Sequence, residues 1–111
     1  MKTPYYLIDE QLLEKNLKIL QTVKKQTGCK ILLAQKCFSM FSVYPLIAKY
    51  LDGTTASGLF EAKLGYEEMH KENHIFSGAY RDDEIEEIMS ICDHVVFNSL
   101  NQWQKYQDLA K

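Results

Sequence analysis

Short apolar segments alternate with helical segments four times in this chain, and this alternation constrains the fold more than any other feature. The strand-like segments are Lys30–Ala34, Gly53–Ser57, His74–Ser77 and His94–Phe97. Helices are expected after them, at about 42–50, 59–70, 82–91 and 100–110. Strict alternation at this spacing is typical of parallel strands joined by right-handed crossovers. The pattern predicts an α/β fold, either a doubly wound sheet or half of a (β/α)8 barrel.

A further strand and helix are expected before this alternation. Tyr5–Ile8 is rich in aromatic and β-branched residues and predicts a strand. Asp9 can cap the helix that follows, and Gly28 can end it in a left-handed conformation. The apolar positions expected on one face of this helix are Leu13, Leu17, Leu20 and Val23.

Composition and length limit the possible functions. The chain has 111 residues with a net charge of -2, whereas a complete (β/α)8 barrel needs about 250 residues. The charge balance provides no reason to expect nucleic acid or an anionic membrane as a partner. The sequence has no long apolar run and no signal-peptide pattern at its start, so we expect a cytoplasmic protein.

Neither the cysteines nor the histidines show metal-ligand spacing. Cys29, Cys37 and Cys92 fit no CxxC motif, so reduced thiols in or near a core are expected. The histidines are also spaced unlike ligands, and no metal site is expected. These histidines are His70, His74 and His94. The acidic run 82–84 is most simply a solvated helix start, because the helix dipole favours acids there.

Lys36 is the candidate catalytic residue, since it lies just beyond the apolar segment 31–34. Functional groups of α/β barrels gather at the carboxyl ends of the strands. The apolar flanks predict a partly desolvated amine, which would be a better nucleophile toward an aldehyde. A lysine at a strand end can also be a simple solvated cap, and spacing alone does not decide between these interpretations.

Several stretches of the chain resemble one enzyme family. The segment LLAQKCFSM resembles the lysine strand of the alanine racemase-like, fold type III enzymes that use pyridoxal 5'-phosphate (PLP). Within this group the chain is most similar to the carboxynorspermidine/carboxyspermidine decarboxylases. The matching segments are TPYYLIDEQLLEKNL, YPLIAKYLDGTTASGLFEAKLG and DHVVFNSLNQW. The resemblance extends from Thr3 to Trp103 and favours the (β/α)8 TIM barrel.

The resemblance assigns roles to two residues. Lys36 falls on the lysine that binds PLP covalently, and Ser57 falls on an element beside the cofactor. Ser57 could instead cap the helix that begins near Leu59. Met40 stands where alanine racemase has a catalytic tyrosine, which argues against racemase activity. The groups that bind the phosphate, the pyridine nitrogen and the substrate amines would lie beyond Lys111.

The resemblance also implies a domain organisation. Residues 1–8 would contribute a strand to a C-terminal β domain, and residues 9–111 would form part of the PLP-binding barrel. The chain would then be an incomplete N-terminal portion of the enzyme. The intact family forms homodimers with active sites at the subunit interface, and the isolated portion is expected to be inactive.

The activity implied by the resemblance is loss of CO2 from carboxynorspermidine or carboxyspermidine, which yields norspermidine or spermidine. Two alternatives remain open. The first is another PLP decarboxylase of the same fold, of the diaminopimelate or ornithine type. The second is a catalytically silent half-barrel that only folds or self-associates.

Overall fold

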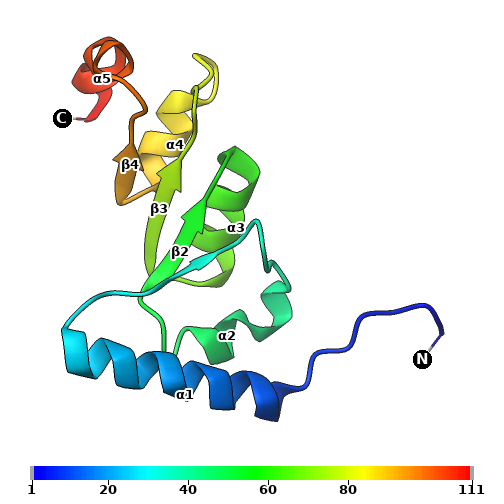
Figure 1. The fold of residues 1–111 in the computed structure, drawn as a ribbon. Helices are drawn as coiled ribbons and strands as arrows, with labels where there is room; N and C mark the ends of the chain where they lie inside the picture. Colours follow the sequence, from blue (N-terminus) through cyan, green and yellow to red (C-terminus); the bar gives the residue numbers. More distant parts are fainter. Residues whose placement is uncertain (1, 111) are drawn as a thin grey trace.

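Four short strands form one parallel sheet in the computed structural model, which describes residues 2–110. The strands are β1 (Leu32–Ala34), β2 (Gly53–Ala56), β3 (Glu72–Phe76) and β4 (His94–Val96), and they lie in this order (Figure 1). Every neighbouring pair is parallel. The expected α/β fold with parallel strands is therefore confirmed.

The helices alternate with the strands as expected, with shorter bounds in several cases. They are α1 (Glu10–Thr27), the 3-10 helix η1 (Phe41–Val43), α2 (Tyr44–Ile47), α3 (Leu59–Glu68), α4 (Ile85–Ile91), α5 (Leu100–Tyr106) and the 3-10 helix η2 (Gln107–Ala110). The expected helix at 42–50 is broken into η1, α2 and a turn. The expected helix at 100–110 ends in 3-10 geometry. None of the helices among residues 2–110 has the length and apolar character needed to cross a membrane.

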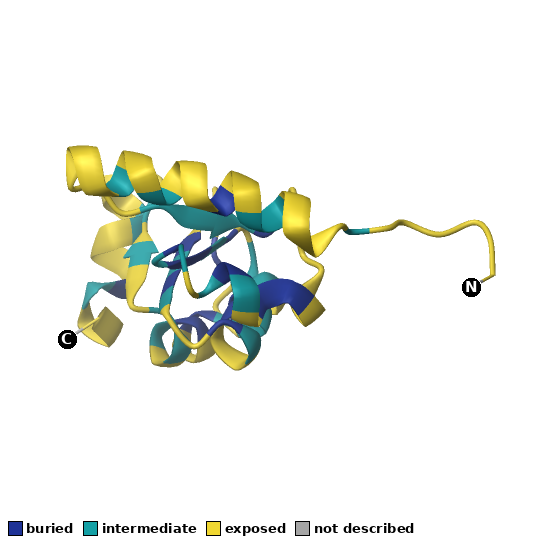
Figure 2. Ribbon diagram, turned by 90° about the horizontal axis from the view of Figure 1, so that it is seen from below, coloured by how far each residue is buried: buried dark blue, intermediate teal, exposed yellow. Residues whose placement is uncertain are grey.

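The first helix begins and ends at the expected residues. The Asp9 carboxylate accepts hydrogen bonds from the N–H groups of Gln11 and Leu12, at 3.0 and 3.2 Å. Gly28 ends α1 at φ 72°, in the left-handed region that favours glycine. However, the expected apolar face is only partly used: Leu17 is buried, whereas Leu20 and Val23 remain exposed. Most of α1 is exposed, as Figure 2 shows.

The strand expected at Tyr5–Ile8 is not formed. These residues lead away from the sheet, and Tyr6 and Leu7 are exposed (Figure 1). A strand requires a neighbour to complete its backbone hydrogen bonds, and no described strand lies beside this segment. Its assignment to a separate β domain stays a prediction.

The core consists of two buried clusters. The first lies between β2, β3 and the helices α3 and α4, and its fully buried members include Ala62 and Ile75. The second joins α1, η1 and α2 and includes Leu17, Tyr44 and Ile47. Polar residues are also buried in this part of the fold: Gln35, Thr54 and Asn73.

The acidic run 82–84 is solvated and precedes α4 directly, as expected, but it lies just outside the helix and also makes a contact with α5. α4 begins only at Ile85. The Asp82 carboxylate accepts a hydrogen bond from the Tyr106 hydroxyl at 2.5 Å and pairs with Lys105 at 2.7 Å. These contacts lower the pKa of Asp82, first through the Lys105 ammonium and then through the Tyr106 hydroxyl. They join the start of α4 to α5.

Candidate active site

A pocket of about 350 Å³ lies at the carboxyl edge of the sheet, beyond β1, β2 and β3. Its lining includes Lys36, Ser57 and Ser77, together with Ala34, Thr55, Ala56, Phe76 and Gly78. The volume is within the range of about 300–1,000 Å³ that is typical of small-molecule sites. Both residues predicted for the site, Lys36 and Ser57, therefore line one pocket.

Sheet register brings these two residues together. Ala34 on β1 pairs with Thr55 on β2, and Lys36 and Ser57 each follow two positions later. The Gln35 N–H continues the ladder by donating to the Thr55 carbonyl at 3.2 Å. Because the strands are parallel, their carboxyl ends meet at the same edge.

The surroundings of Lys36 differ from the expectation of a partly desolvated amine. Residues 35–37 form a turn, and Lys36 is exposed. Within residues 2–110 its ammonium makes no ion pair, so no carboxylate of this region holds it away from the pocket. Lys36 is therefore free to reach a ligand.

The turn that carries Lys36 is anchored by its buried neighbour Gln35. The amide Nε2 of Gln35 donates to the Glu61 carbonyl at 2.8 Å, and its Oε1 accepts a hydrogen bond from the Tyr44 hydroxyl at 3.0 Å. Burial, with a smaller contribution from the Glu61 carboxylate, raises the pKa of Tyr44 to about 12, so the hydroxyl stays protonated. These bonds connect β1, α2 and α3 immediately beside the candidate lysine.

Ser57 does not cap the backbone of α3, so that alternative was wrong. The N-cap of α3 is Gly58, which has no side chain to cap with. The Ser57 hydroxyl donates to the Glu61 carboxylate instead. On the other side of the pocket, the Ser77 hydroxyl donates to the Ala79 carbonyl at 2.9 Å. Both hydroxyl protons are thus used within the chain, and what each can offer a ligand is an acceptor lone pair.

Sequence reasoning missed Gln35, Tyr44 and Glu61. These three residues meet through hydrogen bonds between segments that are far apart in the chain, and the periodicity of the sequence does not reveal such contacts. One available signal was Gln35 itself, since a polar residue ending an apolar strand needs a hydrogen-bond partner when it is buried.

The cysteines are mostly outside the core. All three thiols are free, but only the partly buried Cys92 lies near a core as expected; Cys29 and Cys37 are exposed. Burial raises the pKa of the Cys92 thiol to about 11, so this residue is protonated at neutral pH.

A second hollow, of about 640 Å³, lies at the opposite edge of the sheet. It is lined by residues that precede β3 and β4, among them Lys71 and Asp93. Parallel α/β enzymes place their functional groups at the carboxyl ends of the strands. The pocket around Lys36 is therefore the candidate active site even though it is smaller.

The fold and this pocket define a parallel α/β protein with a lysine at the carboxyl edge of its sheet. No family model matches the chain. It is 44% identical over 110 residues to a carboxynorspermidine/carboxyspermidine decarboxylase of Herminiimonas arsenicoxydans, with 99% of this chain and 30% of the relative aligned. It is 45% identical over 107 residues to the Campylobacter jejuni decarboxylase of the same name, with 96% and 28% aligned.

A solved structure agrees with these relatives. The chain matches the crystal structure of Campylobacter jejuni carboxynorspermidine decarboxylase complexed with norspermidine, with a TM-score of 0.96 and 44% identity. The match covers 99% of this chain and 30% of that one. A carboxyaminopropylagmatine decarboxylase of Synechocystis is 35% identical, with 100% of this chain and 29% of the relative aligned. The chain is thus homologous to the carboxynorspermidine decarboxylases and spans about 30% of their length.

Proposed function

We propose that this chain is the part of a PLP-dependent carboxynorspermidine or carboxyspermidine decarboxylase that carries the covalent anchor of the cofactor. The observation that carries the proposal is the pocket shared by Lys36 and Ser57, in a chain 44% identical to such decarboxylases. The four βα units would be half of a (β/α)8 barrel, and residues 1–8 would belong to a β domain. The complete protein would be a homodimer.

The residues of the pocket fit this role. Lys36 supplies an exposed primary amine beside a cavity of suitable size. PLP, when bound, supplies the electron sink that allows the substrate to lose CO2. The buried hydrogen bonds of Gln35 hold the turn from which the Lys36 side chain extends. A group attached at Nζ would therefore start from a fixed backbone position, as catalysis by orientation requires.

Ser57 would contact the cofactor from the residue that follows β2. Because its proton is donated to Glu61, its oxygen can only accept a hydrogen bond while that contact persists. An acceptor does not bind a phosphate dianion. By resemblance to the family, the phosphate and pyridinium contacts would come from residues outside this chain, in line with the share of the relatives that it covers.

A chimaeric enzyme tests the proposal. The homologous 30% of the Campylobacter jejuni relative is replaced by this chain, and CO2 release is measured with PLP and carboxynorspermidine. We expect turnover that Lys36→Arg abolishes, because a guanidinium stays protonated and cannot attack an aldehyde. Lys49→Arg is the matched control, since Lys49 is exposed and outside the pocket.

Substrate comparison and cofactor labelling complete the test. Carboxyaminopropylagmatine, diaminopimelate and ornithine are assayed in parallel, and a clear preference for one of them would reassign the substrate. Borohydride reduction of the PLP-loaded chimaera followed by peptide mapping should place the label on Lys36. A folded chimaera that is labelled on other lysines, or on none, would contradict the proposal.

A further inference from the structure

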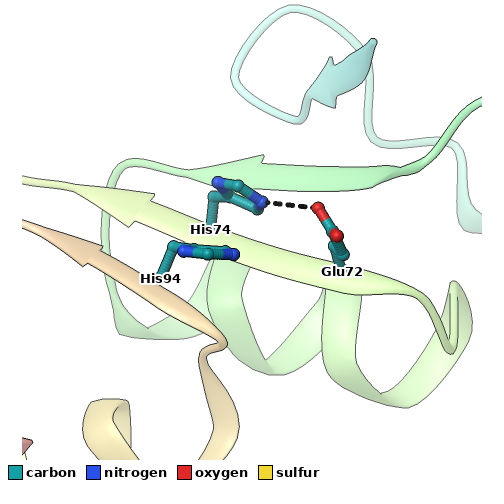
Figure 3. Close-up of side chains that lie close together, drawn as sticks. All are labelled: Glu72, His74 and His94. Carbon is teal, nitrogen blue, oxygen red and sulfur yellow. Dashed lines mark hydrogen bonds and ion pairs between the residues drawn. The ribbon is translucent and has the colours of Figure 1, made fainter. Parts of the chain in front are cut away.

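Three potential metal ligands come together on β3 and β4; none of them lines the pocket around Lys36, although His74 pairs in the sheet with Thr55, which does. Glu72 and His74 are two residues apart on β3, so their side chains point to the same face. His94 on β4 is the direct partner of His74 in the sheet register. Figure 3 shows the two imidazoles side by side, with a hydrogen bond between Glu72 and His74.

The face that carries this cluster is opposite to the one covered by α3 and α4. Asn73, between the two β3 ligands, points the other way: its Nδ2 donates to the Ala62 carbonyl at 2.9 Å and to the Ile91 carbonyl at 3.0 Å. Glu72 and His74 therefore face away from these helices. They are partly buried, whereas His94 is exposed. The cluster can be reached from solvent in this chain.

The ligand atoms are close enough to share one ion. One donor atom from each residue lies within 4.8 Å of the others, and His74 Nε2 is 3.1 Å from Glu72 Oε2. Ligand atoms of tetrahedral zinc, with bonds of about 2.0–2.2 Å, lie about 3.3–3.6 Å apart. The imidazole centroids are 4.3 Å apart, so binding one ion requires the exposed His94 ring to move until its ligand nitrogen reaches this spacing.

We propose that Glu72, His74 and His94 bind one divalent transition-metal ion, with zinc as the best fit. Two imidazoles and one carboxylate are a ligand set of zinc sites that keep a fourth position open for water. Calcium and magnesium are disfavoured, because they prefer sites built from oxygen ligands. The proposal does not depend on Lys36 or on decarboxylase activity.

Lys30 supports this arrangement. Its ammonium pairs with Glu72 Oε1, while Oε2 faces His74. The carboxylate can therefore keep its contact with Lys30 and bind an ion through Oε2. Metal-binding carboxylates are usually oriented by such a hydrogen bond, which fixes the direction of the free oxygen.

Zinc titration of the 111-residue chain tests the proposal, with a chromophoric chelator as competitor. We expect one zinc ion per chain and a loss of affinity of roughly 100-fold or more in His94→Ala and in Glu72→Gln, since even an orienting partner of a ligand is worth about 10–100-fold. His70→Asn is the matched control. His70 is exposed, belongs to no part of the cluster and has a positive φ that asparagine tolerates.

Two further readouts make the result decisive. Zinc should shift the imidazole NMR signals of His74 and His94 but not those of His70. Circular dichroism checks that the variants fold, and Glu72→Gln keeps the shape of the side chain if His94→Ala fails. Unchanged zinc affinity in folded His94→Ala and Glu72→Gln would overturn the proposal, because cysteines or scattered surface groups would then bind the metal. An equal loss in His70→Asn would overturn it as well.

Discussion

Replacing Gly65 by alanine tests the packing that supports the Lys36 turn. Gly65 is buried in α3, and a Cβ built there would lie 2.3 Å from Thr54 Oγ1 and 3.0 Å from Gln35 Nε2. Thr54 is fully buried on β2, and a β-branched side chain has few alternative rotamers. The added methyl group must therefore displace α3 or β2, and with it the hydrogen bond from Gln35 to Glu61.

The opposing energies can be compared. Alanine is favoured over glycine within a helix by about 0.5–1 kcal/mol. Overpacking a buried site costs about 1–3 kcal/mol, and weakening the Gln35 hydrogen bond costs about 1 kcal/mol more. The sum predicts that Gly65→Ala lowers the free energy of unfolding by about 2 kcal/mol. With a urea m-value of about 2 kcal/mol/M, the unfolding midpoint falls by about 1 M.

Urea unfolding followed by circular dichroism measures this effect, at concentrations where the wild-type chain is monodisperse. Gly78→Ala is the control, because a Cβ there meets nothing within 4 Å, and its stability should change by less than about 0.5 kcal/mol. Thr54→Ala removes the Oγ1 atom that the new methyl group would meet. The double variant Gly65→Ala/Thr54→Ala should therefore be more stable, by about 1 kcal/mol, than the sum of the two single effects predicts. A Gly65→Ala chain as stable as the wild type would refute the reasoning.

Four further outcomes are expected. Burial raises the pKa of Asp52, but the Ile31 N–H and Lys24 outweigh this effect, so the pKa lies below its ordinary value of 3.8. The stabilisation by the ionised Asp52 carboxylate is present above pH 3.8 and is lost as the pH falls through the lower pKa of the folded state. Asp52→Asn should therefore lower the free energy of unfolding by about 1 kcal/mol at pH 7 and leave it unchanged in strong acid, as measured by unfolding at several pH values. Lys36→Ala in an active chimaera should remove the PLP absorbance near 420 nm along with turnover, and retention of both would exclude Lys36 as the anchor. The chain alone should release no CO2 from carboxynorspermidine and should form dimers or larger species on sizing, because its edge strands are unpaired; turnover by the purified chain that Lys36→Ala abolishes would contradict this. The amides of the exposed residues Tyr6 and Leu7 should exchange rapidly in the monomer, and strong protection there would show that the segment is anchored.

The network around Gln35 suggests how a lysine can be both exposed and well placed. The Lys36 side chain is exposed, whereas the preceding residue, Gln35, is almost fully buried and hydrogen-bonded to two other elements. Removing one partner would leave a buried polar group unsatisfied, at a cost of about 1–3 kcal/mol. The position of the Lys36 backbone is therefore maintained by buried contacts even though its amine is free.

The local sequence pattern determined the order of the strands and helices and the ends of the first helix. The order of strands and helices followed from apolar segments and their spacing, because burial of one helix face leaves a periodic pattern and burial of both strand faces leaves a continuous apolar run. The ends of α1 followed from Asp9 and Gly28, whose side chain and backbone freedom act within a few residues. The position of Lys36 after the first apolar strand was equally local. By contrast, Tyr5–Ile8 has strand-like composition but pairs with no described strand, because a strand also needs a neighbour and composition does not reveal one.

Tertiary structure decided which distant residues meet. The register between β1 and β2 places Lys36 and Ser57 on one pocket, and the register between β3 and β4 places His94 beside His74. A shift of one residue in either pairing would point these side chains to opposite faces. The same holds for Gln35, whose partners on α2 and α3 are 9 and 26 residues away. Such contacts depend on how the strands and helices pack together, and no local pattern in the sequence encodes them.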